Sequence, residues 1–144
     1  MTEADRICKT LKSALGKRSE IKFAYLFGSL AKGTAGRTSD IDVAVYVDDK
    51  ALKMEQGYGY KAELTTALMS ALGTNKVDVV VLNVAKPFLR HQVMKNGKVI
   101  LSNDAREAAD FIVDTMRRYD DAKRLMAIQH HYMLRRIEEG RFGR

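Results

Sequence analysis

Residues 23–47, FAYLFGSLAKGTAGRTSDIDVAVYV, hold two apolar runs separated by a segment rich in glycine, serine and threonine. The first run, residues 23–27, is apolar throughout, which is typical of a buried strand. The second run, residues 40–47, alternates with a period of two, as a strand with one buried face does. The stretch therefore predicts two strands of one sheet, joined by a loop that begins at Gly28.

The first residues of this loop, Gly28 and Ser29, are suited to holding an anion. A glycine lets the backbone approach a bulky ligand closely, and a serine can donate hydrogen bonds from both its hydroxyl and its amide. Residues 30–32 can begin a helix whose unpaired N–H groups would point toward the same ligand. These features predict a phosphate-binding turn at the end of the first strand.

Asp40 and Asp42 share one face of the predicted second strand, with their Cα atoms roughly 6.6 Å apart. A close pair of like charges costs about 4 kcal/mol at an effective dielectric constant near 20. A cation between the two carboxylates would remove that cost. Oxygen ligands at this spacing suit one or two Mg²⁺ ions that bridge the phosphates of a nucleotide.

A third carboxylate, Asp78, is the only polar residue in the apolar run 77–82. Taken alone, it is explained equally well as the water-exposed end of a strand. Because Asp40 and Asp42 already predict a metal site, we favour a shared site. There Asp78 would lie near the metals and accept the proton of an attacking hydroxyl.

The pattern of Gly28-Ser29, ten residues, Asp40-x-Asp42 and a later Asp78 resembles the signature of the DNA polymerase beta-like nucleotidyltransferase superfamily. More closely, it is similar to the minimal nucleotidyltransferases (MNT) that act as antitoxins beside HEPN-domain toxins. The resemblance implies that Gly28 and Ser29 bind the triphosphate and that Asp40 and Asp42 hold the metals. It also implies that Asp78 contributes to metal binding and deprotonates the acceptor.

The resemblance further implies an α/β nucleotidyltransferase fold, with a small mixed sheet that carries the site on one face and packs helices on the other. The implied reaction is Mg²⁺-dependent transfer of AMP from ATP to a hydroxyl, with release of pyrophosphate. The implied acceptor is a tyrosine of a HEPN ribonuclease toxin, which the modification silences. Two alternatives stay open: transfer to a small molecule such as an aminoglycoside, and a non-catalytic antitoxin that blocks its partner sterically.

The composition limits the classes of protein that the chain can belong to. Its 144 residues, 46% of them hydrophobic, fit one compact domain and exclude disordered and fibrous classes. The single cysteine, Cys8, lies at helical spacing with Leu11 and Leu15, which predicts a buried thiol. No apolar window reaches the ~18 residues of a membrane span. We expect a reduced, cytoplasmic compartment and no membrane partner.

A net charge of +7 raises the question of nucleic-acid binding. The basic residues are scattered among acidic ones, and no tract interleaves them with stacking aromatic residues. We therefore interpret the charge as a solvated surface and expect no direct nucleic-acid partner. Lys32 and Arg37 lie beside or within the loop, where a phosphate contact and a solvent-facing position are equally favoured.

The remaining sequence predicts further elements by its apolar spacing and its breakers. The expected elements are helices at residues 3–15, 62–72 and 87–94 and an edge strand at residues 98–101. Tyr58 and Tyr60 flank Gly59 in an expected loop, where they either form part of an acceptor pocket or pack on the surface of their own domain. His91, beside Arg90, is expected to be an ordinary surface residue.

Residues 104–139 contain no proline or glycine, and their apolar side chains recur at helical spacing. One helix of this span is roughly 50 Å long, whereas a globule of this size has a radius of gyration of about 14 Å. Part of it should project or fold back. A second apolar set favours a partner surface or a fold-back, and comprises Ala122, Leu125, Ile128 and Tyr132. We divide the chain into a core, residues 1–103, and a helical extension, residues 104–144.

Overall fold

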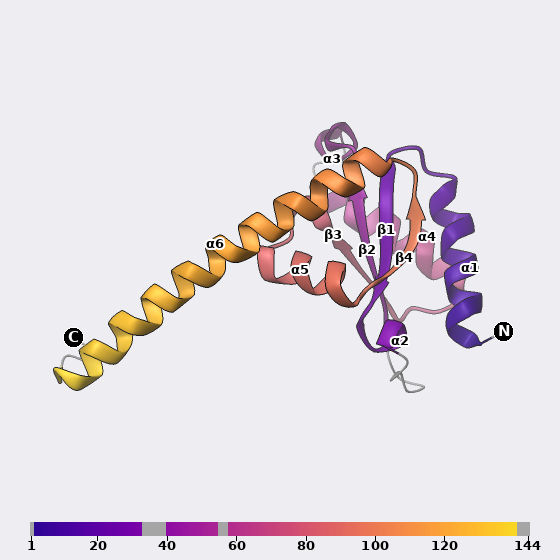
Figure 1. Cartoon of the computed structure of the whole chain (residues 1–144). Helices are drawn as coiled ribbons and strands as arrows, with labels where there is room; N and C mark the ends of the chain where they lie inside the picture. The colour runs from indigo at the N-terminus through magenta and orange to yellow at the C-terminus, as the bar shows by residue number, and fades with distance from the viewer. Residues whose placement is uncertain (1, 33–39, 55–57, 141–144) are drawn as a thin grey trace.

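The computed structural model describes residues 2–32, 40–54 and 58–140 of the chain. One four-stranded sheet lies at its centre, with helices on both faces (Figure 1). In chain order the elements are α1 (Glu3–Gly16), β1 (Ile21–Phe27), α2 (Gly28–Lys32), β2 (Ile41–Val47), α3 (Asp49–Met54), α4 (Tyr58–Leu72), β3 (Val77–Val81), the 3-10 helix η1 (Leu82–Val84), α5 (Pro87–Asn96), β4 (Lys98–Ser102) and α6 (Ala105–Glu138). The expected α/β fold with a long C-terminal helix is confirmed.

The sheet is mixed, as expected, and its strand order is β3-β2-β1-β4. β1 is antiparallel to both β2 and β4, and β2 is parallel to β3. The C-terminal end of β1 therefore lies beside the N-terminal ends of β2 and β3. Phe27 pairs with Asp42, and Asp42 pairs with Asp78, so these three residues form one row across β1, β2 and β3. The predicted loop begins directly after Phe27, at Gly28.

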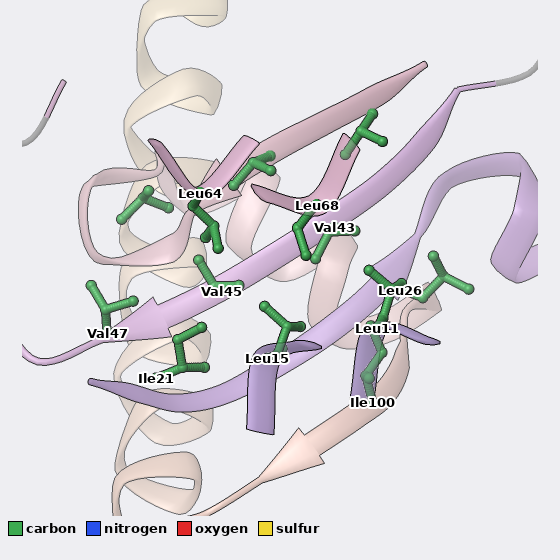
Figure 2. Close-up of a cluster of buried hydrophobic side chains, with 14 of the residues drawn as sticks. Leu11, Leu15, Ile21, Leu26, Val43, Val45, Val47, Leu64, Leu68 and Ile100 are labelled. Carbon is green, nitrogen blue, oxygen red and sulfur yellow. The ribbon is translucent and has the colours of Figure 1, made fainter. Parts of the chain in front are cut away.

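One face of the sheet packs against α1 and α4 (Figure 2). Leu11 of α1 and Leu64 of α4 are fully buried against Val43 and Val45 of β2. Full burial of each such side chain contributes roughly 1.5–3 kcal/mol to folding. The predicted direction of the apolar side chains of β2 is thus confirmed.

The opposite face of the sheet, which carries Asp42, is also partly covered by helices. Phe23 and Tyr25 of β1 form a second buried cluster with Val93 of α5 and Phe111 of α6. The expectation that helices pack only on the face away from the site is therefore wrong, because aromatic side chains on this face need cover from water. The cover ends before the row of Asp42, which is half-buried.

Helix α4 begins at Tyr58, four residues earlier than its apolar spacing predicted. Tyr60 is buried in the core, and its hydroxyl donates a hydrogen bond of 2.8 Å to Glu20. The expectation that Tyr60 lies in a loop, either in an acceptor pocket or on the surface of its own domain, is therefore wrong, because burial in the core and the hydrogen bond to Glu20 outweigh the local signal of Gly59. The side chain of Tyr58 lies outside the described residues.

Arg90 of α5 is only 5% exposed and joins three elements. Its guanidinium donates to the carbonyl oxygens of Leu82 at 2.8 Å and Asn83 at 2.9 Å. It also pairs with Asp114 of α6 at 3.3 Å and lies over the ring of Phe111. Burial lowers the pKa of Arg90. This residue fixes the base of α6 against α5 and η1.

His91 is half-buried and stacks on Tyr119 of α6, with 3.6 Å between the ring centroids. The expectation of an ordinary surface residue is therefore wrong for His91. Phe88 meets the same tyrosine edge-on, at 5.5 Å. The contact between α5 and α6 thus extends as far along α6 as Tyr119.

Beyond this contact α6 projects into solvent as one continuous helix (Figure 1). Asp104 caps its start by accepting a hydrogen bond of 3.0 Å from the amide of Glu107. Its 34 residues correspond to a length of about 51 Å. Residues 123–140 are all exposed, so the helix does not fold back onto its own domain.

Cys8 packs against the core cluster that Leu11 and Leu15 help to form, but it is only half-buried. The expected burial of its thiol is therefore partial. Within the described ranges, no helix combines the length and hydropathy that crossing a bilayer requires.

Candidate active site

Asp42 and Asp78 occupy paired positions on two parallel strands. Neighbouring strands are separated by about 4.8 Å, and paired residues share a face of the sheet, so the two carboxylates are close neighbours. Phe27 pairs with Asp42 from the other side, which brings the following residue, Gly28, to the same place. The structure thus brings together residues that are 50 positions apart in the sequence.

Asp40 lies just before β2 and two residues from Asp42 along the chain. An extended backbone places two such residues on one face, and the charge of Asp40 acts on Asp42. The three carboxylates differ in exposure: Asp42 is half-buried in the middle, whereas Asp40 and Asp78 are exposed. Asp42 is therefore the central member of the group.

Gly28 has a left-handed backbone conformation with φ of 78°. A side chain in this region costs roughly 1–2 kcal/mol. A Cβ atom at this position would also lie 3.0 Å from Cγ of Asp42 and would overlap its Oδ2. Glycine is thus required here both by the turn and by the carboxylate that packs against it.

Burial and the charges of its neighbours both act on the Asp42 carboxyl. Burial raises the pKa of the Asp42 carboxyl, and the charges of Asp78 and Asp40 raise it further. A bound cation would relieve both effects. Oxygen donors of this kind match the preference of Mg²⁺.

The carboxylates do not form a finished metal cage. Among the described residues, no three His, Cys, Asp or Glu side chains converge closely enough to hold a metal by themselves. Mg²⁺ is commonly bound through one or two carboxylates together with the phosphates of a substrate. The donor set therefore fits a metal ion whose remaining ligands come from a nucleotide.

The remaining candidates lie at or beyond the start of the loop. Ser29 follows Gly28 in α2 and is half-buried. Lys32 is the last residue of α2, and its side chain lies outside the described residues, as does all of Arg37. Sequence reasoning missed the contact between Gly28 and Asp42, because it depends on a strand register that no local signal encodes.

The Polymerase beta, Nucleotidyltransferase family matches residues 9–106 of the chain. This span holds Gly28, Ser29, Asp40, Asp42 and Asp78. The chain belongs to this family. Residues 1–8 and 107–144 lie outside the match and carry none of the candidate site residues.

The nucleotidyltransferase is similar to the protein adenylyltransferase MntA of Shewanella oneidensis, with 34% identity over 115 residues. The aligned stretch covers 80% of this chain and 76% of the relative. The fold of the nucleotidyltransferase is similar to that in a crystal structure of a toxin–antitoxin with AMP-PNP, at 31% identity and a TM-score of 0.63, covering 91% of this chain and 99% of that chain. It is also similar to the structure of a tri-AMPylated Shewanella oneidensis HEPN toxin in complex with MNT antitoxin, at 28% identity and a TM-score of 0.57, covering 90% of this chain and 95% of that chain.

The fit between Gly28 and Asp42 can be tested with a matched pair of variants. Gly73 also has a positive φ, of 68°, but nothing lies within 4 Å of its missing Cβ. Gly73→Ala should therefore lower the free energy of unfolding by about 1–2 kcal/mol without affecting nucleotide transfer. Gly28→Ala should also displace Asp42 and reduce transfer on the order of 100-fold, as misplacement of a reacting group does. Thermal unfolding and AMP incorporation measure both, and equal behaviour of the two variants would contradict the contact.

Proposed function

We propose that this nucleotidyltransferase transfers AMP from ATP to a hydroxyl of a HEPN toxin and thereby neutralises it. The observation that carries the proposal is the grouping of Asp40, Asp42 and Asp78 around the turn at Gly28. The similarity to MntA, a protein adenylyltransferase, supports it, as does the similarity to an antitoxin bound to a tri-AMPylated HEPN toxin. The family pattern favours a tyrosine as the acceptor.

The roles proposed for the residues are those of the family pattern, and the positions of the residues fit them. Gly28 and Ser29 hold the triphosphate through backbone and hydroxyl donors at the end of β1. Asp42, between the other two carboxylates, and Asp40 hold Mg²⁺, which when bound offsets the charge that develops on the α-phosphate and on pyrophosphate. Asp78 also contributes to metal binding.

The acceptor side of the site is the edge of the sheet, where Asp78 is exposed. Asp78 orients the acceptor hydroxyl and takes its proton. The acceptor oxygen then forms a bond to the α-phosphorus as the bond from that phosphorus to the pyrophosphate oxygen breaks. An exposed carboxylate on an edge strand suits this role better than the half-buried Asp42.

The helical extension supplies the surface for the partner in this proposal. The core, residues 1–103, contains all five site residues. Of the extension, residues 104–144, the described part leaves the body after Tyr119 (Figure 1). Its distal segment, residues 123–138, is exposed throughout and exposes large apolar side chains to solvent. The exposed apolar side chains are Leu125, Met126, Ile128, Tyr132, Met133, Leu134 and Ile137. Contiguous surfaces of this kind mark sites of protein association.

The same surface favours a second candidate, an antitoxin that blocks its partner without chemistry. Three mutually repelling carboxylates give such a protein no benefit, which makes catalysis the better explanation. Transfer to an aminoglycoside-type molecule has less support, because α6 projects away and does not wall off the site. ATP as a substrate and a single half-buried cysteine suit a cytoplasmic location.

Turnover separates catalysis from blocking. A trace of the protein, with ATP and Mg²⁺, should inactivate a large excess of the HEPN protein cloned from the neighbouring reading frame. Intact-mass spectrometry should show that the toxin gains mass in steps of one AMP. Inhibition that needs one antitoxin per toxin and persists without ATP would instead establish the blocking mechanism.

A further inference from the structure

Strand β3, which carries Asp78, is an edge strand that pairs only with β2. The amide of Ile41 in β2 donates to the carbonyl of Lys76 at 2.8 Å, which fixes the direction of the backbone groups. Along a strand, the backbone N–H and C=O groups of successive residues point alternately to one side and the other, so those of residues 76, 78 and 80 point toward β2. The residues whose N–H and C=O groups face the open edge are Val77, Val79 and Val81. The carbonyl of Val81, the N-cap of η1, accepts the first hydrogen bond of that helix, whereas the backbone groups of Val77 and Val79 bond to no described residue.

An apolar hollow of about 460 Å³ lies along this edge, two residues from Asp78. On the face of the sheet that carries the site, it is lined by Val80 and Leu89, and Val84, just after the end of β3, also borders it. On the other face it is lined by Leu52 and Lys61, and the ammonium group of Lys61 pairs with no described acidic residue. The hollow thus straddles the open edge.

We propose that the acceptor segment of the partner protein binds as an extended strand along the open edge of β3, with its hydroxyl residue opposite Asp78. This inference rests on the proposed function and specifies how the acceptor reaches the site. Edge strands bind peptides through main-chain hydrogen bonds, and pockets for alternate side chains provide specificity. The edge of β3 offers open backbone groups and an apolar hollow, and both lie close to Asp78, the carboxylate proposed to deprotonate the acceptor.

The geometry of strand pairing sets the register of the bound segment. Directly opposed residues of paired strands have Cβ atoms about 4.5–5.5 Å apart. A hydroxyl residue opposite Asp78, on the same face, would therefore lie beside its carboxylate. The residue two positions along would lie next to Val80 and enter the hollow, which favours an apolar side chain there.

The residue between these two would point to the opposite face, toward Lys61. An acidic side chain there would pair with its ammonium group. The expected acceptor segment is therefore extended, with a hydroxyl residue and an apolar residue two positions apart and an acidic residue between them. The other edge strand, β4, lies across the full width of the sheet from Asp78 and cannot present an acceptor to it.

The two edges allow a matched pair of variants. Val84 borders the hollow and is 79% exposed, and Val99 on β4 is 56% exposed, so an aspartate at either position should leave folding intact. Val84→Asp should raise the KM for the HEPN protein about tenfold or more, because it places a charge in an apolar contact. Val99→Asp should leave the KM unchanged, and both variants should bind AMP-PNP like the wild type.

Hydrogen exchange, measured by NMR with and without the HEPN protein, tests the strand pairing itself. The amides of Val79 and Val81 should exchange more slowly in the complex, whereas the outer edge of β4 should not change. An unchanged KM for Val84→Asp, together with unchanged exchange at Val79 and Val81, would overturn the inference. Protection that grows with the concentration of this chain alone would assign the edge to a second copy and overturn it as well.

These outcomes are distinct from failure of the proposed function. If Asp42→Asn retains transfer, the assigned chemistry is wrong whatever happens at the edge. If Asp42→Asn abolishes transfer while Val84→Asp and the exchange rates match the wild type, the chemistry stands and the acceptor binds elsewhere.

Discussion

Asp42→Asn should reduce AMP transfer by more than ~10²-fold, as loss of a major electrostatic stabiliser does. Asp42 lies between the other two carboxylates, and the asparagine side chain would keep the shape of the aspartate but lose its charge. The packing against Gly28 should therefore survive while the affinity for a cation falls. The measurement is incorporation of labelled AMP into the HEPN protein in the presence of Mg²⁺.

The stability of the Asp42→Asn variant shows whether a loss of transfer comes from the site or from unfolding. The pKa of Asp42 is raised in the folded protein, so the folded state binds that proton more tightly than the unfolded chain. Without metal, the variant should therefore be at least as stable as the wild type at neutral pH. This advantage should vanish as the pH falls through the raised pKa. Asp120→Asn, on the exposed face of α6, should change neither stability nor transfer. Wild-type transfer by Asp42→Asn would falsify the assigned role.

Local patterns predicted much of the site. The alternation in residues 40–47 placed Asp42 on the face opposite Val43 and Val45, and both valines are indeed fully buried. Such patterns succeed because the period of a strand is a property of neighbouring residues. The spacing of Gly28 and the three aspartates then pointed to the family that the comparison with known proteins confirmed.

These local patterns could not predict how strands distant in sequence pair with one another. The row that joins Phe27, Asp42 and Asp78 depends on strand order and register, and neither is encoded in a short stretch. The coverage of the site face by α5 and α6 was missed for the same reason. An aromatic residue such as Phe23 predicts burial, but it does not indicate which element will cover its side chain.

Arg90 and Tyr60 show a second limit of local reasoning. A charged residue beside a histidine reads as surface, yet Arg90 is buried because backbone carbonyls of η1 and the carboxylate of Asp114 satisfy its donors. The glycine beside Tyr60 predicts a loop, yet the tyrosine side chain is buried and its hydroxyl reaches the half-buried Glu20. A polar side chain can be buried when hydrogen-bond partners are available to it. In both cases these partners are distant in sequence or belong to the backbone.

Helix α5 connects the two surfaces assigned to the partner. Leu89 lines the hollow beside β3, and the next residue, Arg90, holds the base of α6 through Asp114. A toxin that contacts the distal segment and presents its acceptor at the edge of β3 must therefore extend past α5. The affinity of the partner and the presentation of its acceptor then depend on different residues, which separate variants can test.

Leu125→Asp with Ile128→Asp should weaken association with the HEPN protein by several kcal/mol, because both charges would be buried without partners in the contact. These side chains are 57% and 52% exposed in the free protein, so the double variant should fold normally and bind ATP. Isothermal titration calorimetry measures both affinities. The matched control is Ala127→Asp with His130→Asp, which adds two carboxylates to the opposite face of the same exposed helix.

The pattern of losses distinguishes the possible roles of α6. Loss of partner affinity in Leu125→Asp/Ile128→Asp, with ATP binding and the melting temperature unchanged, assigns this face of the distal segment to the toxin. Equal loss in both double variants would show that the helix is surrounded on all sides. Unchanged affinity in both would exclude the distal segment as the interface. Loss of ATP binding and of folding would mean that this segment packs on its own domain in solution, contrary to its exposure in the free chain.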